Sequence, residues 1–401
     1  MNQVDVTRGN CVPLIRLPFG PQHPALDLES IHFTFEVDGE RVVSVKPRLG
    51  YMHRGIEKLA ETRTYQQNIH LVERICGICS QAHAICFAQA VEEIADIQIP
   101  DRARYLRTII AELERIQNHF LWLGVAAHEI GFQTLFMYTW RDRELVLDVV
   151  EAMTGKRVNY GINTIGGLRR DITPDHCDLL QKTLDQLEAR SSYYKKICTT
   201  EPTILKRTVD VGVLSKTQAL KLGAVGPTVR ASGVANDIRK DDPYAAYEEI
   251  PFNVITSNGC DVASRLYVRL DELFESIHII RYSLAHLPDG KIHVQAPRLI
   301  PTGDAVSRVE APRGEDFHYV RANGSNKPAR LKVRAPTLAN MLPLCNMFTG
   351  MNIADIPVVI AGIDPCIACA ERVTIHNIST DTTRIVTREE LKHFSQRRAR
   401  D

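Results

Sequence analysis

Two Cys-x-x-Cys pairs constrain the fold of this chain more than any other feature. The first pair is Cys76 and Cys79, and the second, close to the other end of the chain, is Cys366 and Cys369. Two intervening residues let both sulfurs of a pair reach one metal, and Gly77 allows the first loop to turn tightly. Four thiolates form a soft donor set, suited to zinc, iron–sulfur clusters, or nickel and iron. The spacing predicts a metal centre that joins the two ends of the chain, but it does not name the metal.

Two simpler interpretations of these pairs are weaker. A four-cysteine zinc site usually joins pairs that lie closer in sequence than Cys79 and Cys366 do. A thioredoxin-like redox pair requires a βαβ context, which the sequence around neither pair provides. The remaining cysteines have no matching motif and are interpreted as small buried apolar residues. They are Cys11, Cys86, Cys177, Cys198, Cys260 and Cys345.

Composition limits the class of protein. The chain has 401 residues, of which 44% are apolar and 24% are charged, as in an ordinary globular protein. A formal net charge of +1 gives no electrostatic basis for binding nucleic acid or an anionic membrane surface. Residues 1–10 are polar and lack an apolar signal core, so we expect a reduced, non-secreted protein. The absence of an uncharged apolar run of about 18 residues predicts that the chain does not span a membrane.

Hydrophobic periodicity predicts a mainly α-helical α+β fold with a central bundle of long helices. Apolar residues at helical spacing predict a long helix, for which Asp101 is the expected cap. This buried stripe consists of Ile109, Leu113, Ile116, Phe120 and Leu123. Further helices are expected at about 134–153, 174–197 and 260–286.

The β structure is expected to be minor. Alternation over residues 31–37 and a turn at Asp38–Gly39 predict a hairpin, within a small N-terminal β portion at about 12–48. More short strands are expected at about 290–335. We expect one domain over residues 1–372, followed by a C-terminal extension over residues 373–401.

The residues around the cysteines resemble the two signature motifs of nickel–iron hydrogenase large subunits. The first is Arg-Ile-Cys-Gly-Ile-Cys followed by His83, and the second is Asp-Pro-Cys-x-x-Cys near the C-terminus. The resemblance covers nearly the whole chain, and other matching stretches are residues 20–25, 53–58, 230–233, 243–244 and 310–314. The first two of these stretches are also similar to the quinone-site, 49 kDa-like subunit of respiratory complex I. This combination is typical of membrane-bound, energy-converting hydrogenases. The complex I subunit lacks the full set of four cysteines, which this chain has.

The resemblance implies a fold of the nickel–iron hydrogenase large-subunit and complex I type, with a nickel–iron centre. Cys76 and Cys366 would be terminal nickel ligands, and Cys79 and Cys369 would bridge nickel to iron, which also carries carbonyl and cyanide ligands. A terminal thiolate is more basic than a bridging one, so Cys366 is the expected proton acceptor when hydrogen is split. Glu57 matches the family's proton-relay glutamate, although by itself it would be interpreted as an acid at a helix N-terminus.

Other residues are implied to surround the centre. Arg313 matches the arginine that lies over the open coordination position, with Pro312 fixing its backbone and Asp364 as its ion-pair partner. His83 is expected to donate to a bridging cysteine sulfur. Arg74 is expected in the hydrogen-bonding shell that faces the electron-transfer partner. Without the motifs, a lone arginine would be interpreted as a surface charge and His83 as a satisfied core histidine.

The second motif departs from the periplasmic enzymes of the family at Arg372, where those enzymes have histidine. Arginine at this position resembles several membrane-bound relatives and weakens the case for the C-terminal magnesium or iron site that the histidine helps to build. In much of the family an endopeptidase cuts after this residue once nickel is loaded. Cleavage here would release residues 373–401.

The implied function is reversible hydrogen chemistry, 2 H⁺ + 2 e⁻ to H₂, in a membrane-associated complex. The implied partners are a small subunit that carries an iron–sulfur cluster, antiporter-like and complex I-like membrane subunits, hydrogenase maturation factors and a C-terminal endopeptidase. The chain would lie peripherally on the cytoplasmic side of the membrane. Two alternatives remain: a complex I-like quinone or sulfur reductase subunit without nickel, and a non-catalytic scaffold held together by zinc.

Overall fold

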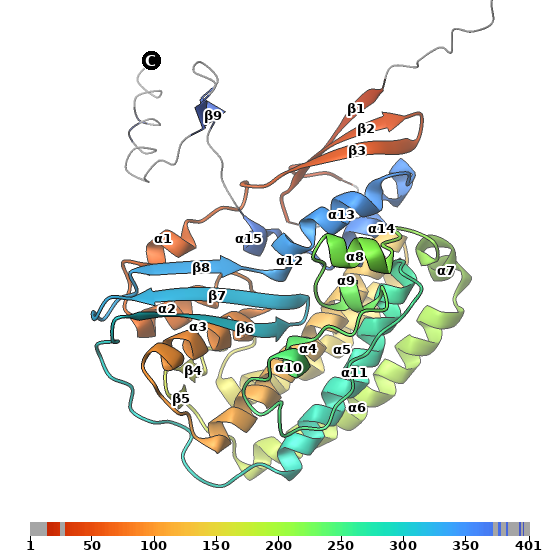
Figure 1. Ribbon diagram of the computed structural model, residues 1–401. Coiled ribbons are helices and arrows are strands. Elements are labelled where there is room, and N and C mark those ends of the chain that lie inside the picture. The colour runs from red at the N-terminus through yellow and green to blue at the C-terminus, as the bar shows by residue number, and fades with distance from the viewer. Residues whose placement is uncertain are drawn as a thin grey trace, which may run out of the picture.

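The computed structural model describes residues 14–24 and 29–371, together with residues 376–377, 382–383, 393 and 396. Figure 1 shows a bundle of long helices, a three-stranded sheet beside it, and a second three-stranded sheet at the N-terminal end. This arrangement confirms the mainly helical α+β prediction. Arg372 and most of the expected C-terminal extension lie outside the described residues.

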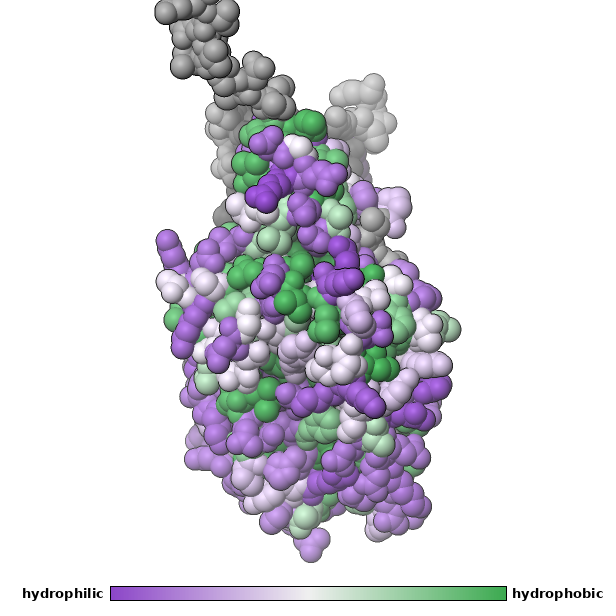
Figure 2. Space-filling view, turned by 90° about the vertical axis from the view of Figure 1, so that its right-hand side faces the viewer, coloured by the Kyte–Doolittle hydropathy of each residue, from purple (hydrophilic) through white to green (hydrophobic). Residues whose placement is uncertain are grey.

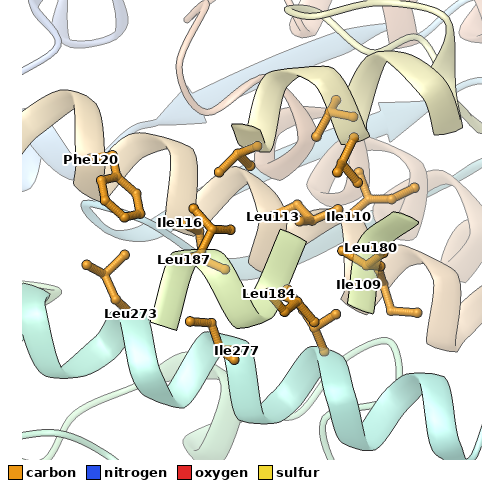
Figure 3. Packing of buried hydrophobic residues seen from close by; sticks show 14 of the residues in the cluster. Ile109, Ile110, Leu113, Ile116, Phe120, Leu180, Leu184, Leu187, Leu273 and Ile277 are labelled. Atoms are coloured by element: carbon orange, nitrogen blue, oxygen red, sulfur yellow. The ribbon is translucent and has the colours of Figure 1, made fainter. Parts of the chain in front are cut away.

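The bundle consists of four long helices, and each corresponds to a helix expected from the sequence. They are α4 (Asp101–Ile130), α5 (Gln133–Thr154), α6 (Pro174–Thr200) and α11 (Val262–Ala285). The predicted apolar stripe of α4 is buried against α6 and α11, and the labelled side chains of these three helices face one another in Figure 3. The prediction that Asp101 caps α4 was wrong. Pro100 takes the extended cap position, and the Asp101 carboxylate pairs with Arg104 in the first turn.

The sheet beside the bundle is an antiparallel meander in the order β6–β7–β8, and it confirms the strands expected near residues 290–335. Its strands are β6 (Gly303–Ala311), β7 (Gly314–Ala322) and β8 (Arg330–Arg334). Because Ala311 pairs with Gly314, Pro312 and Arg313 form a two-residue turn between β6 and β7. Helices α1 (Ile56–Ala60), α2 (Tyr65–Val72) and α3 (Ser80–Ile94) precede the bundle, and α3 packs on β6 and β7.

The N-terminal sheet contains the predicted hairpin, β2 (His32–Asp38) and β3 (Arg41–Arg48), and β1 (Ile15–Phe19) pairs with β2. Its inner face packs on α13 (Met341–Phe348), where Phe33 and Phe35 contact Phe348 with ring centroids 5.7 and 5.2 Å apart. Aromatic contacts therefore fix this sheet to the C-terminal part of the chain.

Short elements connect these parts. They are β4 (Asn163–Thr164), β5 (Gly167–Leu168), α7 (Pro202–Thr208), α8 (Lys216–Lys221), α9 (Pro227–Arg230), α10 (Ile238–Asp241), α12 (Pro336–Ala339), the 3₁₀ helix Ile353–Asp355, α14 (Ile356–Gly362), α15 (Ile367–Ala370), β9 (His376–Asn377) and β10 (Thr382–Thr383).

Among the described helices, none combines the length and apolar character needed to cross a membrane. On the face shown in Figure 2, hydrophilic residues predominate below and apolar residues gather higher up, toward the N-terminal sheet.

Buried charges join the β6–β7 hairpin to the bundle. The guanidinium of Arg230 lies 2.7 Å from a carboxylate oxygen of Glu272 in α11 and 2.7 Å from one of Glu310 in β6. Arg115 in α4 donates to the Glu310 carbonyl at 2.8 Å and pairs with Glu112 at 3.2 Å. Although burial opposes ionisation, Arg115 and Arg239 lower the pKa of Glu112 to about 2. Burial raises the pKa of Glu310 to about 7, so the last residues of β6 are held by the guanidinium groups of Arg230 and Arg115 as well as by apolar packing.

The substitution Leu113→Ala tests the core assignment. Removing this fully buried side chain from α4 is expected to cost about 2–5 kcal/mol of unfolding free energy, because the surrounding helices close the cavity only partly. Leu220→Ala, at a side chain that is 59% exposed in α8, is the control, for which we expect a change within about 0.5 kcal/mol. Urea unfolding of the purified chain, followed by circular dichroism, measures both. Equal costs for the two variants would contradict the assignment.

Candidate metal centre

The structure brings the two cysteine pairs together in the interior. The sulfur atoms of Cys76, Cys79 and Cys369 all lie within 4.8 Å of one another. The fourth sulfur, that of Cys366, interacts with the sulfurs of Cys76 and Cys369. All four residues are at most 5% exposed. Four converging, buried sulfurs form the donor set that a soft metal requires, so these residues fit a metal centre of the predicted kind.

Chain turns at the starts of helices place the sulfurs. Cys79 is the residue immediately before α3, Cys366 is the residue immediately before α15, and the Ile78 amide donates to the Cys76 sulfur at 3.4 Å. At the start of α3, the amides of Gln81 and Ala82 donate to the buried Glu114 carboxylate at 2.7 and 3.0 Å, which holds this end of the helix in place. Hydrogen bonds from the thiols of Cys366, Cys369 and Cys79 hold the pKa of the Cys76 thiol well below its usual value. The sulfurs of the two cysteine pairs therefore act on one another within a single interior site.

Arg54 ties the two cysteine segments to each other. Its guanidinium donates to the carbonyl oxygens of Arg74 at 2.8 Å and Ile75 at 2.7 Å, just before Cys76. It also donates to the carbonyl of Ala368 at 3.4 Å, next to Cys369. Arg54 belongs to the matched stretch at residues 53–58, but no role was predicted for it, because its partners are backbone atoms.

Arg313 lies beside the sulfurs, as predicted. Its guanidinium approaches the Cys76 sulfur at 3.9 Å and binds Asp364 twice, at the carbonyl oxygen (2.7 Å) and at the carboxylate (2.9 Å). Asp364 has a left-handed backbone (φ 55°), which turns the chain between α14 and Cys366. Gly226 packs against the turn so closely that a Cβ there would lie 2.4 Å from the Arg313 carbonyl oxygen. Arg313 and Asp364 are thus brought together, with Pro312 buried in the same turn.

Glu29 is a site residue that was missed at the sequence level. The Cys366 thiol contacts a Glu29 carboxylate oxygen at 3.8 Å, and the Ala368 amide donates to the other oxygen at 2.7 Å. Glu29 precedes β2, in a region interpreted only as β structure. The one available signal was its closeness to the matched stretch at residues 20–25.

Glu57 occupies a different position from Glu29. Its carboxylate pairs with Lys332 at 2.9 Å and accepts the Val333 amide at 3.0 Å. It lines a cavity of about 210 Å³, and Cys369 and Glu371 line the same cavity. Glu57 therefore shares a cavity with Cys369.

A second, larger cavity, of about 440 Å³, is lined by Cys366. Its polar lining includes Glu29, Arg313 and Asp364. Trp122, Phe136 and Trp140 belong to the apolar part of the lining, which comes from α4 and α5. The Cys366 side of the site thus has an apolar approach with a few polar groups at its end.

The remaining predicted site residues have different surroundings. His83 in α3 is buried, and its Nδ1 lies 2.8 Å from the Asp316 carboxylate and 3.1 Å from the His318 ring. No hydrogen bond from His83 to a cysteine sulfur is found among the described residues. Arg74 is half exposed, and its guanidinium donates to the His70 carbonyl rather than to a sulfur.

Comparisons with known proteins agree with this geometry. The model for the "Respiratory-chain NADH dehydrogenase, 49 Kd subunit" matches residues 129–302 and 297–372, and the model for "Nickel-dependent hydrogenase" matches residues 54–124. The membrane-bound hydrogenase subunit alpha of Pyrococcus furiosus is 40% identical over 90% of this chain and 88% of that protein. The carbon monoxide-induced hydrogenase of Rhodospirillum rubrum is 42% identical over 89% of this chain and 99% of that protein.

The three-dimensional structure is also similar to a solved structure. A chain of the membrane-bound sulfane sulfur reductase, an archaeal respiratory membrane complex, superposes with a TM-score of 0.85. It is 32% identical to this chain, and the match covers 91% of this chain and 100% of that one. The cysteine arrangement, the family models and these relatives agree, and the chain belongs to the family of oxidoreductase subunits that comprises the complex I 49 kDa subunit and the nickel–iron hydrogenase large subunit.

Proposed function

We propose that this chain is the catalytic large subunit of a membrane-associated nickel–iron hydrogenase. The observation that carries the proposal is the convergence of all four cysteine sulfurs in one buried site beneath the Arg313 guanidinium. When bound, a nickel–iron centre would supply the two-electron interconversion of hydrogen and protons. The hydrogenase relatives, at 40% and 42% identity, support this choice within the family.

The four sulfurs would hold the metals in two roles. Cys76 and Cys366 would be terminal ligands of nickel, and Cys79 and Cys369 would bridge nickel to an iron that carries carbonyl and cyanide. The surroundings of the two terminal candidates support different tasks. Cys76 lies against the Arg313 cation, whereas Cys366 lies against the Glu29 carboxylate. The Cys366 sulfur is therefore the one with a neighbour that can exchange a proton.

Proton movement would use carboxylates on both sides of the site. Glu29 can accept a proton from the Cys366 thiol through the 3.8 Å contact and return it in the opposite direction. Glu57 would be a second proton carrier at the smaller cavity, beside Cys369. Arg313 would present its guanidinium to the reacting side, held in one orientation by its two bonds to Asp364 and by the buried turn at Pro312.

Electrons must come from a partner. The described residues contain no second cysteine cluster besides this site, so we propose an iron–sulfur small subunit as the electron partner, with Arg74 in the shell that faces it. Antiporter-like and complex I-like subunits would attach the chain to the cytoplasmic side of a membrane. Maturation factors would load the metals, and an endopeptidase would cut after Arg372.

One rival function has direct support. The structural match to a sulfane sulfur reductase and the 49 kDa family model favour a nickel-free quinone or sulfur reductase subunit as the second candidate. A zinc-bound scaffold is the third. The three functions differ in the metal that the cysteines would hold.

Metal analysis of the native complex distinguishes the three candidate functions. We expect about one nickel per chain, together with infrared bands of iron-bound carbonyl and cyanide, and loss of nickel in Cys369→Ser because a hydroxyl is a poorer ligand for a soft metal. Cys177→Ser, outside the site and partly exposed, is the matched control and should keep its nickel. Zinc in place of nickel would support the scaffold. Absence of nickel, zinc and infrared bands would support the reductase.

The substitution Arg313→Lys tests whether hydrogen chemistry requires the guanidinium of Arg313. Lysine keeps the positive charge but cannot bind both Asp364 oxygens in the same way, so we expect hydrogen oxidation and evolution to fall by about 10²-fold while nickel content stays unchanged. The control is Arg308→Lys on the same hairpin, where the side chain is 41% exposed. Activity of Arg313→Lys equal to that of the control would exclude this role.

Glu29→Gln and Glu57→Gln together identify the proton carrier. Because Glu29 contacts the Cys366 thiol at 3.8 Å, we expect the Glu29 variant to lower hydrogen–deuterium exchange activity by about 10²-fold or more, and the Glu57 variant to have a smaller effect. Nickel content and infrared bands of both variants show whether the centre is intact. The reverse order of effects would assign the relay to Glu57 instead.

A further inference from the structure

A buried group of two histidines and one carboxylate lies between α3 and β7. Asp316 and His318 are two residues apart on β7, so both side chains point to the same face of the sheet. Helix α3, which carries His83, packs on β6 and β7 (Figure 1). All three side chains are at most 1% exposed. Buried positions on a strand are usually apolar, so a cluster of three ionisable side chains needs a reason beyond packing.

The three donor atoms of this group form a nearly equilateral triangle. Nδ1 of His83 lies 2.8 Å from Oδ2 of Asp316 and 3.1 Å from Nε2 of His318, and the third side, between His318 Nε2 and Asp316 Oδ2, is 3.4 Å. A point just outside the plane of such a triangle lies about 2.1 Å from all three atoms, which is the bond length of zinc to imidazole nitrogen or carboxylate oxygen. Among the described residues, the only other group of potential metal ligands that converges this closely is that of the cysteines.

Hydrogen bonds alone leave one side of the triangle unfavourable. If both ring nitrogens carry a proton, the two N–H groups crowd each other across the 3.1 Å side. If either nitrogen lacks its proton, its lone pair faces the carboxylate oxygen of Asp316. A cation near the centre removes this conflict, since all three atoms then direct a lone pair to it.

The charge of Asp316 gives a second reason for a cation. Its carboxylate is fully buried, and neither oxygen accepts a hydrogen bond of good geometry from a described residue. Its ion-pair contacts in the described chain are with the two imidazoles, not with a lysine or an arginine. Burying a carboxylate without such a partner is costly, whereas a bound metal ion supplies the positive charge.

We propose that His83, Asp316 and His318 bind a zinc ion at a site separate from the four cysteines. Two imidazoles and one carboxylate form a donor set that zinc takes, whereas magnesium and calcium prefer oxygen ligands. Zinc has no geometric preference of its own and accepts three protein ligands with a solvent molecule in the fourth position. Each bound ring is neutral, with its proton on the outer nitrogen, so the site requires no charged histidine. This inference does not rest on the proposed function, because it uses none of the cysteines.

The ion would connect two segments that carry parts of the cysteine site. His83 lies one helical turn after Cys79, and its amide donates to the Cys79 carbonyl at 3.3 Å. Asp316 follows Arg313 by three residues on the β6–β7 hairpin. A zinc ion between them would fix α3 to that hairpin in addition to the apolar packing, so its role would be structural.

Zinc analysis and zinc-edge X-ray absorption of the native complex test this site. We expect about one zinc per chain, surrounded by nitrogen and oxygen at about 2.0–2.1 Å and without the sulfur shell near ~2.3 Å that cysteine ligands give. Asp316→Asn and His318→Gln, purified in the presence of a chelator, should each lose this zinc, because only two ligands remain. Asp142→Asn, at a buried carboxylate that accepts from the Tyr194 hydroxyl, is the matched control and should keep it.

The coordination shell separates this site from the cysteine centre. Zinc with a nitrogen and oxygen shell supports the site whether or not the complex holds nickel. A wild-type complex without zinc overturns the site and leaves the hydrogenase proposal intact. Zinc bound only by sulfur also overturns it, and that result would support the scaffold instead. Full retention of zinc in Asp316→Asn or His318→Gln overturns the ligand assignment, and if neither variant assembles, the wild-type spectrum alone decides.

Discussion

The buried ion pairs around Arg230 are the interaction on which the site depends. Arg230 joins Glu272 of the bundle to Glu310 at the end of β6, three residues before Arg313. Removing one partner from such a network leaves an uncompensated charge in the interior, at a cost of about 3–5 kcal/mol. The Arg230 ion pairs therefore fix the β6–β7 hairpin relative to the helix bundle. The orientation of Arg313 over the cysteines follows from that position, since Gly226 and Asp364 close the turn from the other sides.

The cysteine site is built from backbone contacts as much as from side chains. Arg54 binds the carbonyl groups beside both cysteine pairs, and Glu29 accepts the amide next to Cys369. These bonds link the two cysteine pairs to each other through the protein itself. Such support from neighbouring groups restricts the positions that the sulfurs can take.

Periodicity predicted the long helices because their stability comes from one buried stripe, which is a local pattern in the sequence. The cysteine pairs, Arg313 and Asp364 could also be identified, since their motifs are local. Glu29 could not be identified, because its partner is distant in sequence: Glu29 and Cys366 are 337 residues apart. A carboxylate and a histidine on alternate positions of a strand were a usable signal at Asp316 and His318, because both fall on the face that an α/β packing buries. Asp101 was an error of the opposite kind. Its residue type favours the N-cap of a helix, but Pro100 occupies that position in α4.

The separation of the two cysteine pairs has a consequence for the order of folding. Cys76 and Cys79 are fixed by α3 and its neighbours, whereas Cys366 and Cys369 follow α14, after almost all of the other elements. Contacts of such long range form late, since the entropy of closing the intervening loop must be overcome first. Half of the ligand set is therefore complete on a partly folded chain while the other half is still open. Under the proposed function, the site would be open to metal during this interval, and packing of α15 would end it.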